Sequence, residues 1–154
     1  MDNTEKLKTG TTTMGRSLPI STRHSIEICS LLRGKTSEQG RKILERVITK
    51  KSAVPYRKHM HGVGHRSGNM AAGRYPEKAS SYILGVLKNA ESNAQDKGLI
   101  APFIIKEIVA NQASRSWHYG RQKRRKTKRT HLKVVLEELK SAKEKVEAKS
   151  KKEK

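Results

Sequence analysis

Basic residues gather in two windows of the sequence, 46–76 and 108–136, that contain no aspartate or glutamate. The windows hold 16 of the 35 lysines and arginines, whereas the other residues carry 19 basic and 14 acidic side chains, so the net charge of +21 is regional. Like charges this close repel one another unless a polyanion neutralises them, and phosphates do so with release of counterions. Either window on its own could be explained without a partner, as a solvated helix face or a charged tail. The two windows together favour RNA or DNA as the partner.

Two of the six aromatic residues, Trp117 and Tyr119, lie in the second window. Aromatic faces stack on unpaired bases and arginine planes bond phosphates, a combination typical of RNA contact. The alternative is that both rings pack on the base of the protein's own hairpin. We predict that basic, aromatic and imidazole side chains of the two windows bind RNA, namely Arg57, Lys58, His65, Arg66, Arg74, Arg115, Trp117, Tyr119, Arg121, Lys123, Arg124, Arg125, Lys126, Lys128, Arg129 and His131.

Three closely spaced histidines, His59, His61 and His65, have a spacing that could bind a metal ion in a metal-dependent nuclease. No Cys, Asp or Glu lies within ten residues to complete the ligand set or to orient an imidazole. We therefore expect no metal, no cofactor and no catalytic site, and expect these histidines to contact phosphate or ribose. Cys29 is the only cysteine, which excludes an internal disulfide, and its apolar helical surroundings predict core packing.

Neither a membrane span nor a secretory signal is predicted. No apolar run approaches the ~18 residues of a span, and residues 1–8 lack the apolar segment of a signal peptide. The densest basic run, residues 121–129, contains no apolar residue, so it lacks the face with which a helix lies on a membrane. We expect a cytoplasmic protein that does not insert into membranes.

Three helices must position these side chains, over about 21–34, 36–48 and 77–97. The second begins with a capping box formed by Thr36 and Gln39. The third carries apolar residues along one face of a 3.6-residue repeat, at Ala79, Ile83, Val86, Leu87, Ala90 and Ala94. Between the second and third helices, residues 52–75 have no hydrophobic period and four glycines, which predicts an irregular functional loop.

Two strands are predicted, over 103–111 and 130–139, from β-branched residues and from the alternation of Leu132, Val134 and Leu136 with polar residues. About 18 residues separate them, more than the ~2–5 of a tight hairpin, so the extra length must project from the core.

The domain organisation follows from these elements. We predict a flexible N-terminal lead over 1–14 and a charged C-terminal tail over 140–154. Between them lies an RNA-binding domain over 15–139, which includes the loop 52–75 and an extended hairpin over 103–139.

Several separate motifs are together highly specific for one known family. They are Leu18-Pro19-Ile20-Ser21, Leu32-Arg33-Gly34-Lys35, Val54-Pro55-Tyr56-Arg57, Gly62-Val63-Gly64-His65-Arg66, Gly73-Arg74-Tyr75-Pro76, Lys88-Asn89-Ala90-Glu91-Ser92-Asn93-Ala94 and Arg129-Thr130-His131-Leu132. Over about 15–139 the sequence resembles the universal large-ribosomal-subunit protein twenty-two family, in the branch shared by archaea and the eukaryotic cytosol.

The resemblance implies an α+β domain of three helices against a three-stranded antiparallel sheet, with a long protruding basic hairpin. It implies a structural, non-enzymatic constituent of the large ribosomal subunit that binds its rRNA, contacts neighbouring ribosomal proteins and lines the exit tunnel of the nascent peptide. The tunnel tip would consist of Trp117, His118, Tyr119, Gly120 and Arg121. We expect no homo-oligomer. The alternative is a free-standing RNA-binding protein or RNA chaperone that uses the same basic hairpin.

Overall fold

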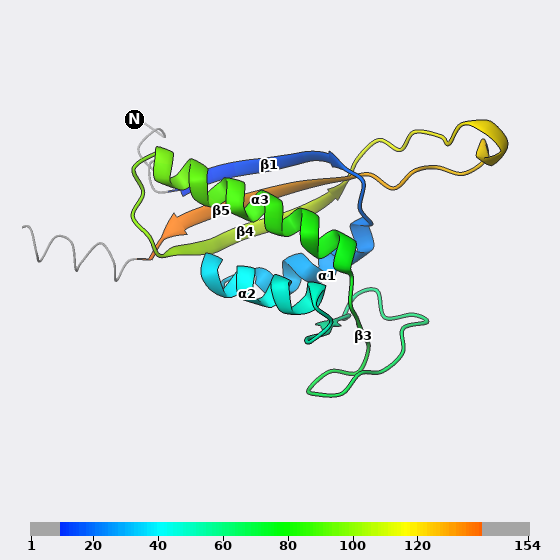
Figure 1. Cartoon of the computed structure of the whole chain (residues 1–154), viewed down its shortest axis with the longest axis horizontal. Coiled ribbons are helices and arrows are strands. Elements are labelled where there is room, and N and C mark those ends of the chain that lie inside the picture. Colours follow the sequence, from blue (N-terminus) through cyan, green and yellow to red (C-terminus); the bar gives the residue numbers. More distant parts are fainter. Residues whose placement is uncertain (1–9, 140–154) are drawn as a thin grey trace, which may run out of the picture.

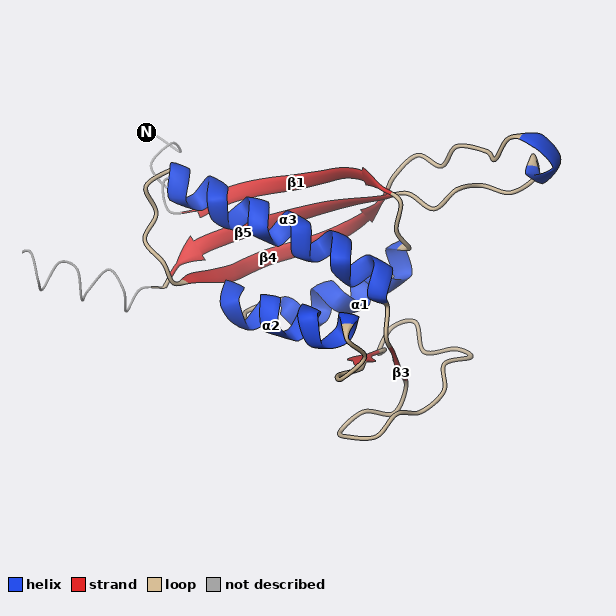
Figure 2. Cartoon of the chain, in the orientation of Figure 1, coloured by secondary structure: helices blue, strands red, loops and turns tan. Residues whose placement is uncertain are grey.

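A computed structural model describes residues 10–139 of the chain. Its centre is a three-stranded antiparallel sheet in the order β1–β5–β4, formed by Gly10–Leu18, Thr130–Glu138 and Phe103–Gln112 (Figure 1, Figure 2). Three helices pack against one another and against the sheet: α1 (Thr22–Leu32), α2 (Ser37–Ile48) and α3 (Glu77–Asp96). The predicted α+β fold is confirmed.

All six apolar residues of the α3 stripe are buried, as the periodicity of this helix predicts. The Thr36 side chain accepts a hydrogen bond from the backbone amide of Gln39 at 3.3 Å, so α2 begins with the predicted cap. Gly40 weakens the first turn of α2, yet a Cβ there would lie only 3.1 Å from Ile105 Cδ1. The glycine therefore allows α2 to approach β4 closely.

β4 and β5 pair antiparallel from one end to the other. Leu132, Val134 and Leu136 are fully buried on the side of the helices, and the residues between them are half-buried on the other side. This alternation confirms the predicted strand. On the side of α1 that faces away from the sheet, β2 (Val54–Pro55) and β3 (Gly73–Arg74) form a two-stranded ribbon that closes the base of the otherwise irregular loop 52–75 (Figure 1).

The predicted flexible lead is wrong for residues 10–14, which belong to β1 and pair with β5. Thr11 is fully buried, and Thr13 Oγ1 accepts a hydrogen bond from Asn93 Nδ2 of α3 at 3.0 Å. Threonine favours strands because it is β-branched, but a run of threonines produces no apolar alternation. A hydrophobic pattern therefore does not reveal this edge strand. The rest of the predicted lead, 1–9, and the predicted tail, 140–154, lie outside the described residues.

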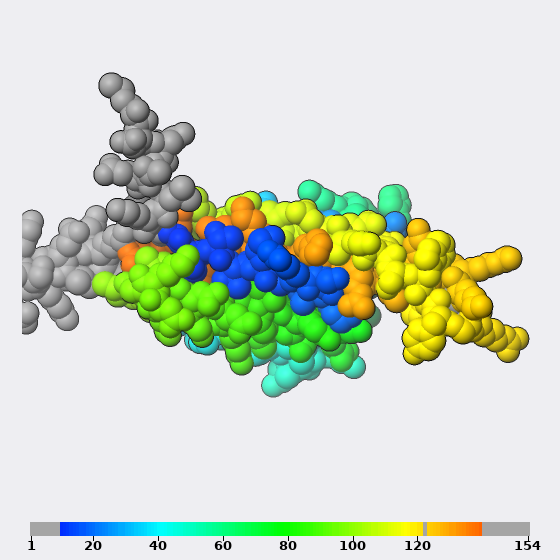
Figure 3. All heavy atoms as spheres, turned by 90° about the horizontal axis from the view of Figure 1, so that it is seen from above, coloured from blue at the N-terminus to red at the C-terminus, as the bar shows by residue number. Residues whose placement is uncertain are grey.

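Seen from above, β1 lies beside α3, and the segment between β4 and β5 forms one far end of the molecule (Figure 3). Among the described residues, no helix is long and apolar enough to cross a membrane.

Candidate nucleic-acid interface

Residues 113–129, which we call the hairpin extension, leave the sheet where β4 ends and return where β5 begins (Figure 1). Its two arms remain together through backbone hydrogen bonds, from Thr127 N to Ser116 O and from His118 N to Arg125 O, both at 2.8 Å. The extension therefore carries the second basic window away from the helices and the sheet.

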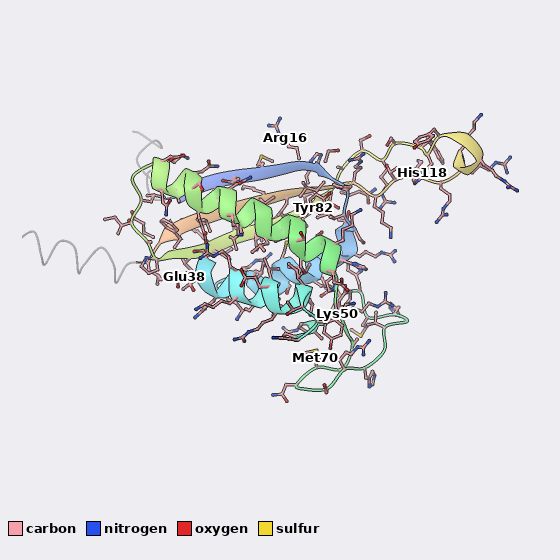
Figure 4. All side chains as sticks on the ribbon, viewed as in Figure 1. Arg16, Glu38, Lys50, Met70, Tyr82 and His118 are labelled. Atoms are coloured by element: carbon pink, nitrogen blue, oxygen red, sulfur yellow. The ribbon has the colours of Figure 1, made fainter. Side chains whose placement is uncertain are left out.

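The cations of the hairpin extension lie at the protein surface. The side chains stand clear of the domain, as the labelled His118 illustrates (Figure 4). Six exposed side chains there form no ion pair with a described residue: Arg115, Arg121, Lys123, Arg124, Lys126 and Lys128. Because carboxylates do not neutralise these charges, a polyanion can do so without breaking existing pairs.

The two aromatic rings near the tip do not pack on the base of the hairpin, so that alternative is wrong. Trp117 is 59% exposed and Tyr119 is 93% exposed. The ammonium of Lys126 lies over the Trp117 ring, 4.4 Å from its centroid, and this cation–π contact holds the ring at the side of the extension. Gly120 turns the chain at the tip with φ of +66° and begins a 3₁₀ helix that ends at Gln122.

A buried carboxylate organises the loop that carries the first basic window. Glu27 on α1 is only 1% exposed, and its two oxygens accept hydrogen bonds from the backbone amides of Arg57, Lys58 and His59 at 2.8–3.0 Å. Three amide donors replace the water that a carboxylate needs. The contact fixes the backbone while the side chains of Arg57 and Lys58 remain exposed. Sequence reasoning missed Glu27, because its sequence position resembles that of a surface helix carboxylate.

Other predicted residues of the loop have contacts that fix their positions. Arg74 Nη2 donates a hydrogen bond to the carbonyl of Gly62 at 3.0 Å, and the Arg66 guanidinium lies 5.4 Å from the centroid of the Tyr75 ring. His65 is exposed. The loop thus presents its cations from a defined backbone.

Arg129 and His131 also hold the protein's own structure. Arg129 Nη1 donates to the carbonyl of Ser17, and His131 Nδ1 accepts from the Ser17 amide, both at 3.1 Å. Ser17 has φ of +52° at the irregular end of β1. These two side chains stabilise that irregularity, so only their remaining nitrogen atoms are available for the RNA contacts predicted for them.

The structure brings the two basic windows together beside α1. His24 lines one hollow with Arg74 of the first window and a second hollow with Lys128 of the second window. Lys78, at the start of α3, lines the second hollow and a third, which continues to Arg129 and along the hairpin extension. Glu77 also lines the second hollow, and its carboxylate pairs with Lys50 at 3.1 Å. We call the surface formed by these three adjoining hollows the basic track.

The pKa of His24 reflects its position between the two basic windows. Burial, followed by the nearby charges of Lys128 and Arg74, lowers the pKa of His24 below its usual 6.5. Sequence reasoning also missed His24 and Lys78 because both lie outside the acid-free windows, and nothing in the sequence indicates that α1 and α3 begin beside Lys128.

The remaining chemical candidates contribute no reactive site among the described residues. No group of three His, Cys, Asp or Glu side chains there could hold a metal ion, so the histidine-based nuclease has no metal site in this part of the chain. Cys29 is buried among apolar side chains, and burial raises its pKa to about 12. It fills the core, as predicted.

Comparisons with known proteins agree with the motifs. The family model described as Ribosomal protein L22p/L17e matches residues 13–137. A protein of Archaeoglobus fulgidus named large ribosomal subunit protein uL22 is 50% identical over 104 residues, which cover 66% of each chain. Proteins with this name from Methanopyrus kandleri and Methanosphaera stadtmanae are 43% and 41% identical over 132 residues, 80% of this chain and 83% and 86% of theirs.

The family match spans every strand and helix of the structure except the ends of β1 and β5. This extent, together with the aligned relatives, means that the chain belongs to the Ribosomal protein L22p/L17e family, a family of structural proteins and not of enzymes.

Proposed function

We propose that the protein is a structural constituent of the cytoplasmic large ribosomal subunit, binds large-subunit rRNA through the basic track and lines the peptide exit tunnel with its hairpin extension. One observation carries the proposal: a projecting arm with two exposed rings and six exposed cations that form no ion pair with a described residue adjoins a second cationic surface. Rings and cations in this combination suit folded RNA, which offers both unpaired bases and phosphates.

The domain and the hairpin extension have separate tasks in this proposal. The loop 52–75, fixed by Glu27, would bind rRNA at the surface of the subunit together with neighbouring ribosomal proteins. The extension would reach between rRNA segments, where its cations find phosphates on both sides. Its tip, from Trp117 to Arg121, would face the nascent peptide, because it is the part farthest from the sheet (Figure 1). The names of the archaeal relatives support the assignment to the large subunit.

Sedimentation of ribosomal subunits tests the proposal. We expect the tagged protein to remain with large subunits at one copy per subunit after a high-salt wash, because many phosphate contacts and a buried extension resist removal. Crosslinked rRNA should map to the tunnel wall for residues 117–121 and to the subunit surface for Arg57 and Arg66. Release of the protein from subunits by salt would instead favour the free-standing RNA-binding protein.

A further inference from the structure

A pocket of about 260 Å³ lies between α1 and the loop 52–75. Four of its side chains carry rings and two carry guanidinium groups: His24, Tyr56, His59, His61, Arg23 and Arg74. None of the described residues that line it is acidic. We call this site the ring pocket. Three of these six side chains, Arg23, His24 and Tyr56, are absent from the RNA contacts predicted from the sequence.

The walls of the ring pocket are fixed in the protein alone. The carboxylate of Glu27 accepts the amide of His59, and Arg74 holds the carbonyl of Gly62 on the far side of the loop. The His24 ring meets the Tyr56 ring edge to face, with centroids 5.8 Å apart and planes at 77°. A ligand would therefore enter a preformed site and would order little of the chain when it binds.

Tyr56 supplies an independent sign that a ligand belongs here. The residue is only 5% exposed, and its hydroxyl group has no hydrogen-bond partner among the described residues. A buried hydroxyl without a partner is unfavourable for the free protein. The hydroxyl oxygen is covered in this structure, so a polar group in the pocket would accept its hydrogen bond after a small shift of the side chains around it.

We propose that the ring pocket binds one unpaired nucleotide of RNA, with the base against the rings and the phosphate on Arg23 or Arg74. A phosphate alone would need only the cations, whereas four rings suit the flat face of a base. RNA is favoured over a free nucleotide because the ring pocket is the first hollow of the basic track and shares His24 with the second hollow, so an RNA chain on the track would already lie beside it. The inference rests on the proposed function and specifies one contact within it.

Bulged RNA duplexes test the inference. The full chain is titrated with a blunt RNA duplex and with four duplexes that differ from it by one bulged A, C, G or U. We expect at least one bulged duplex to bind about five- to a hundred-fold more tightly than the blunt duplex, the range that stacking of one base provides. His61→Ala and Arg23→Gln alter exposed side chains and should reduce this preference to about two-fold or less.

Two further variants separate the pocket from general charge and from folding. His61→Phe keeps a ring and should retain most of the preference. Arg46→Gln removes the same charge as Arg23→Gln from an exposed site on α2 outside the pocket, and it should leave the preference unchanged.

Each other outcome has a separate meaning. Tight binding of all five duplexes without a preference would overturn the ring pocket and leave the proposed function in place. Binding of free nucleoside monophosphates as tightly as bulged RNA would overturn the assignment to RNA. Failure to bind any RNA would count against the proposed function itself.

Discussion

Glu27 shows how one side chain can determine the shape of an RNA-binding loop. We predict that Glu27→Gln lowers the free energy of unfolding by about 1.5–3 kcal/mol, because the amide has one acceptor oxygen for three backbone donors and its NH₂ group faces some of them. Urea unfolding measures this change. Glu45→Gln, at an exposed position of α2, is the control and should change stability by no more than about 0.5 kcal/mol. Equal stabilities of the two variants would refute the anchoring role.

His24 makes stability depend on pH in a defined direction. Its pKa in the folded protein is lowered by burial and by Lys128 and Arg74, so protonation favours the unfolded chain, in which the pKa is near 6.5. This contribution to stability is present above pH 6.5 and is lost as the pH falls from 6.5 toward the folded-state pKa. We predict that His24→Gln loses less stability than the wild type between pH 7.5 and 5. Parallel unfolding curves against pH would contradict this.

At the scale of elements, the hairpin extension is separable from the domain that holds it. The strands β4 and β5 pair along their length without it, and β5 packs against α3. We predict that replacing residues 116–128 by a short turn leaves the midpoint of thermal unfolding within a few degrees of wild type, since a shorter loop closes at slightly lower entropy cost. Circular dichroism on heating measures this.

The same excision should change the structure of the tunnel-wall RNA, but it should not prevent the protein from joining the large subunit. Because Arg57, Arg66 and Arg74 remain on the loop, the shortened protein should still join large subunits. Chemical probing of the tunnel-wall RNA should differ from wild type. Unchanged probing, or a folded variant that fails to join subunits, would show that the domain and the extension do not divide their tasks in this way.

At the scale of the whole molecule, a net charge of +21 makes RNA binding strongly dependent on salt. If six to ten phosphates are neutralised along the basic track and the extension, affinity should fall about 10³- to 10⁵-fold between 50 and 200 mM salt, and somewhat less for single strands. Filter binding at several salt concentrations measures the slope. The excision variant should show a shallower dependence of affinity on salt, because several of its phosphate contacts are lost. Arg46→Gln is the control, and its slope should correspond to the loss of about one phosphate contact at most. A slope near zero would mean that neutral hydrogen bonds dominate.

Local sequence determined the elements of this protein. The α3 stripe and the Thr36 cap were predictable because they depend on residues within one turn or one helix. The strands β4 and β5 were predictable for the same reason, to within one residue at their ends. The projection of the residues between them was predictable too, because it follows from the length of the segment. Charge counting alone located the two basic windows and indicated phosphates as partners.

Only the tertiary structure determined which residues form a common surface. Threonine-rich β1 is a strand because β5 offers it hydrogen-bond partners and α3 covers Thr11, and neither neighbour lies near it in the sequence. Glu27 is an anchor, and not a surface carboxylate, because the amides of residues 57–59 fold onto it about thirty residues later. His24 joins the two windows because helix packing places α1 beside Lys128. Such contacts depend on long-range packing, which a local pattern of residue types does not encode.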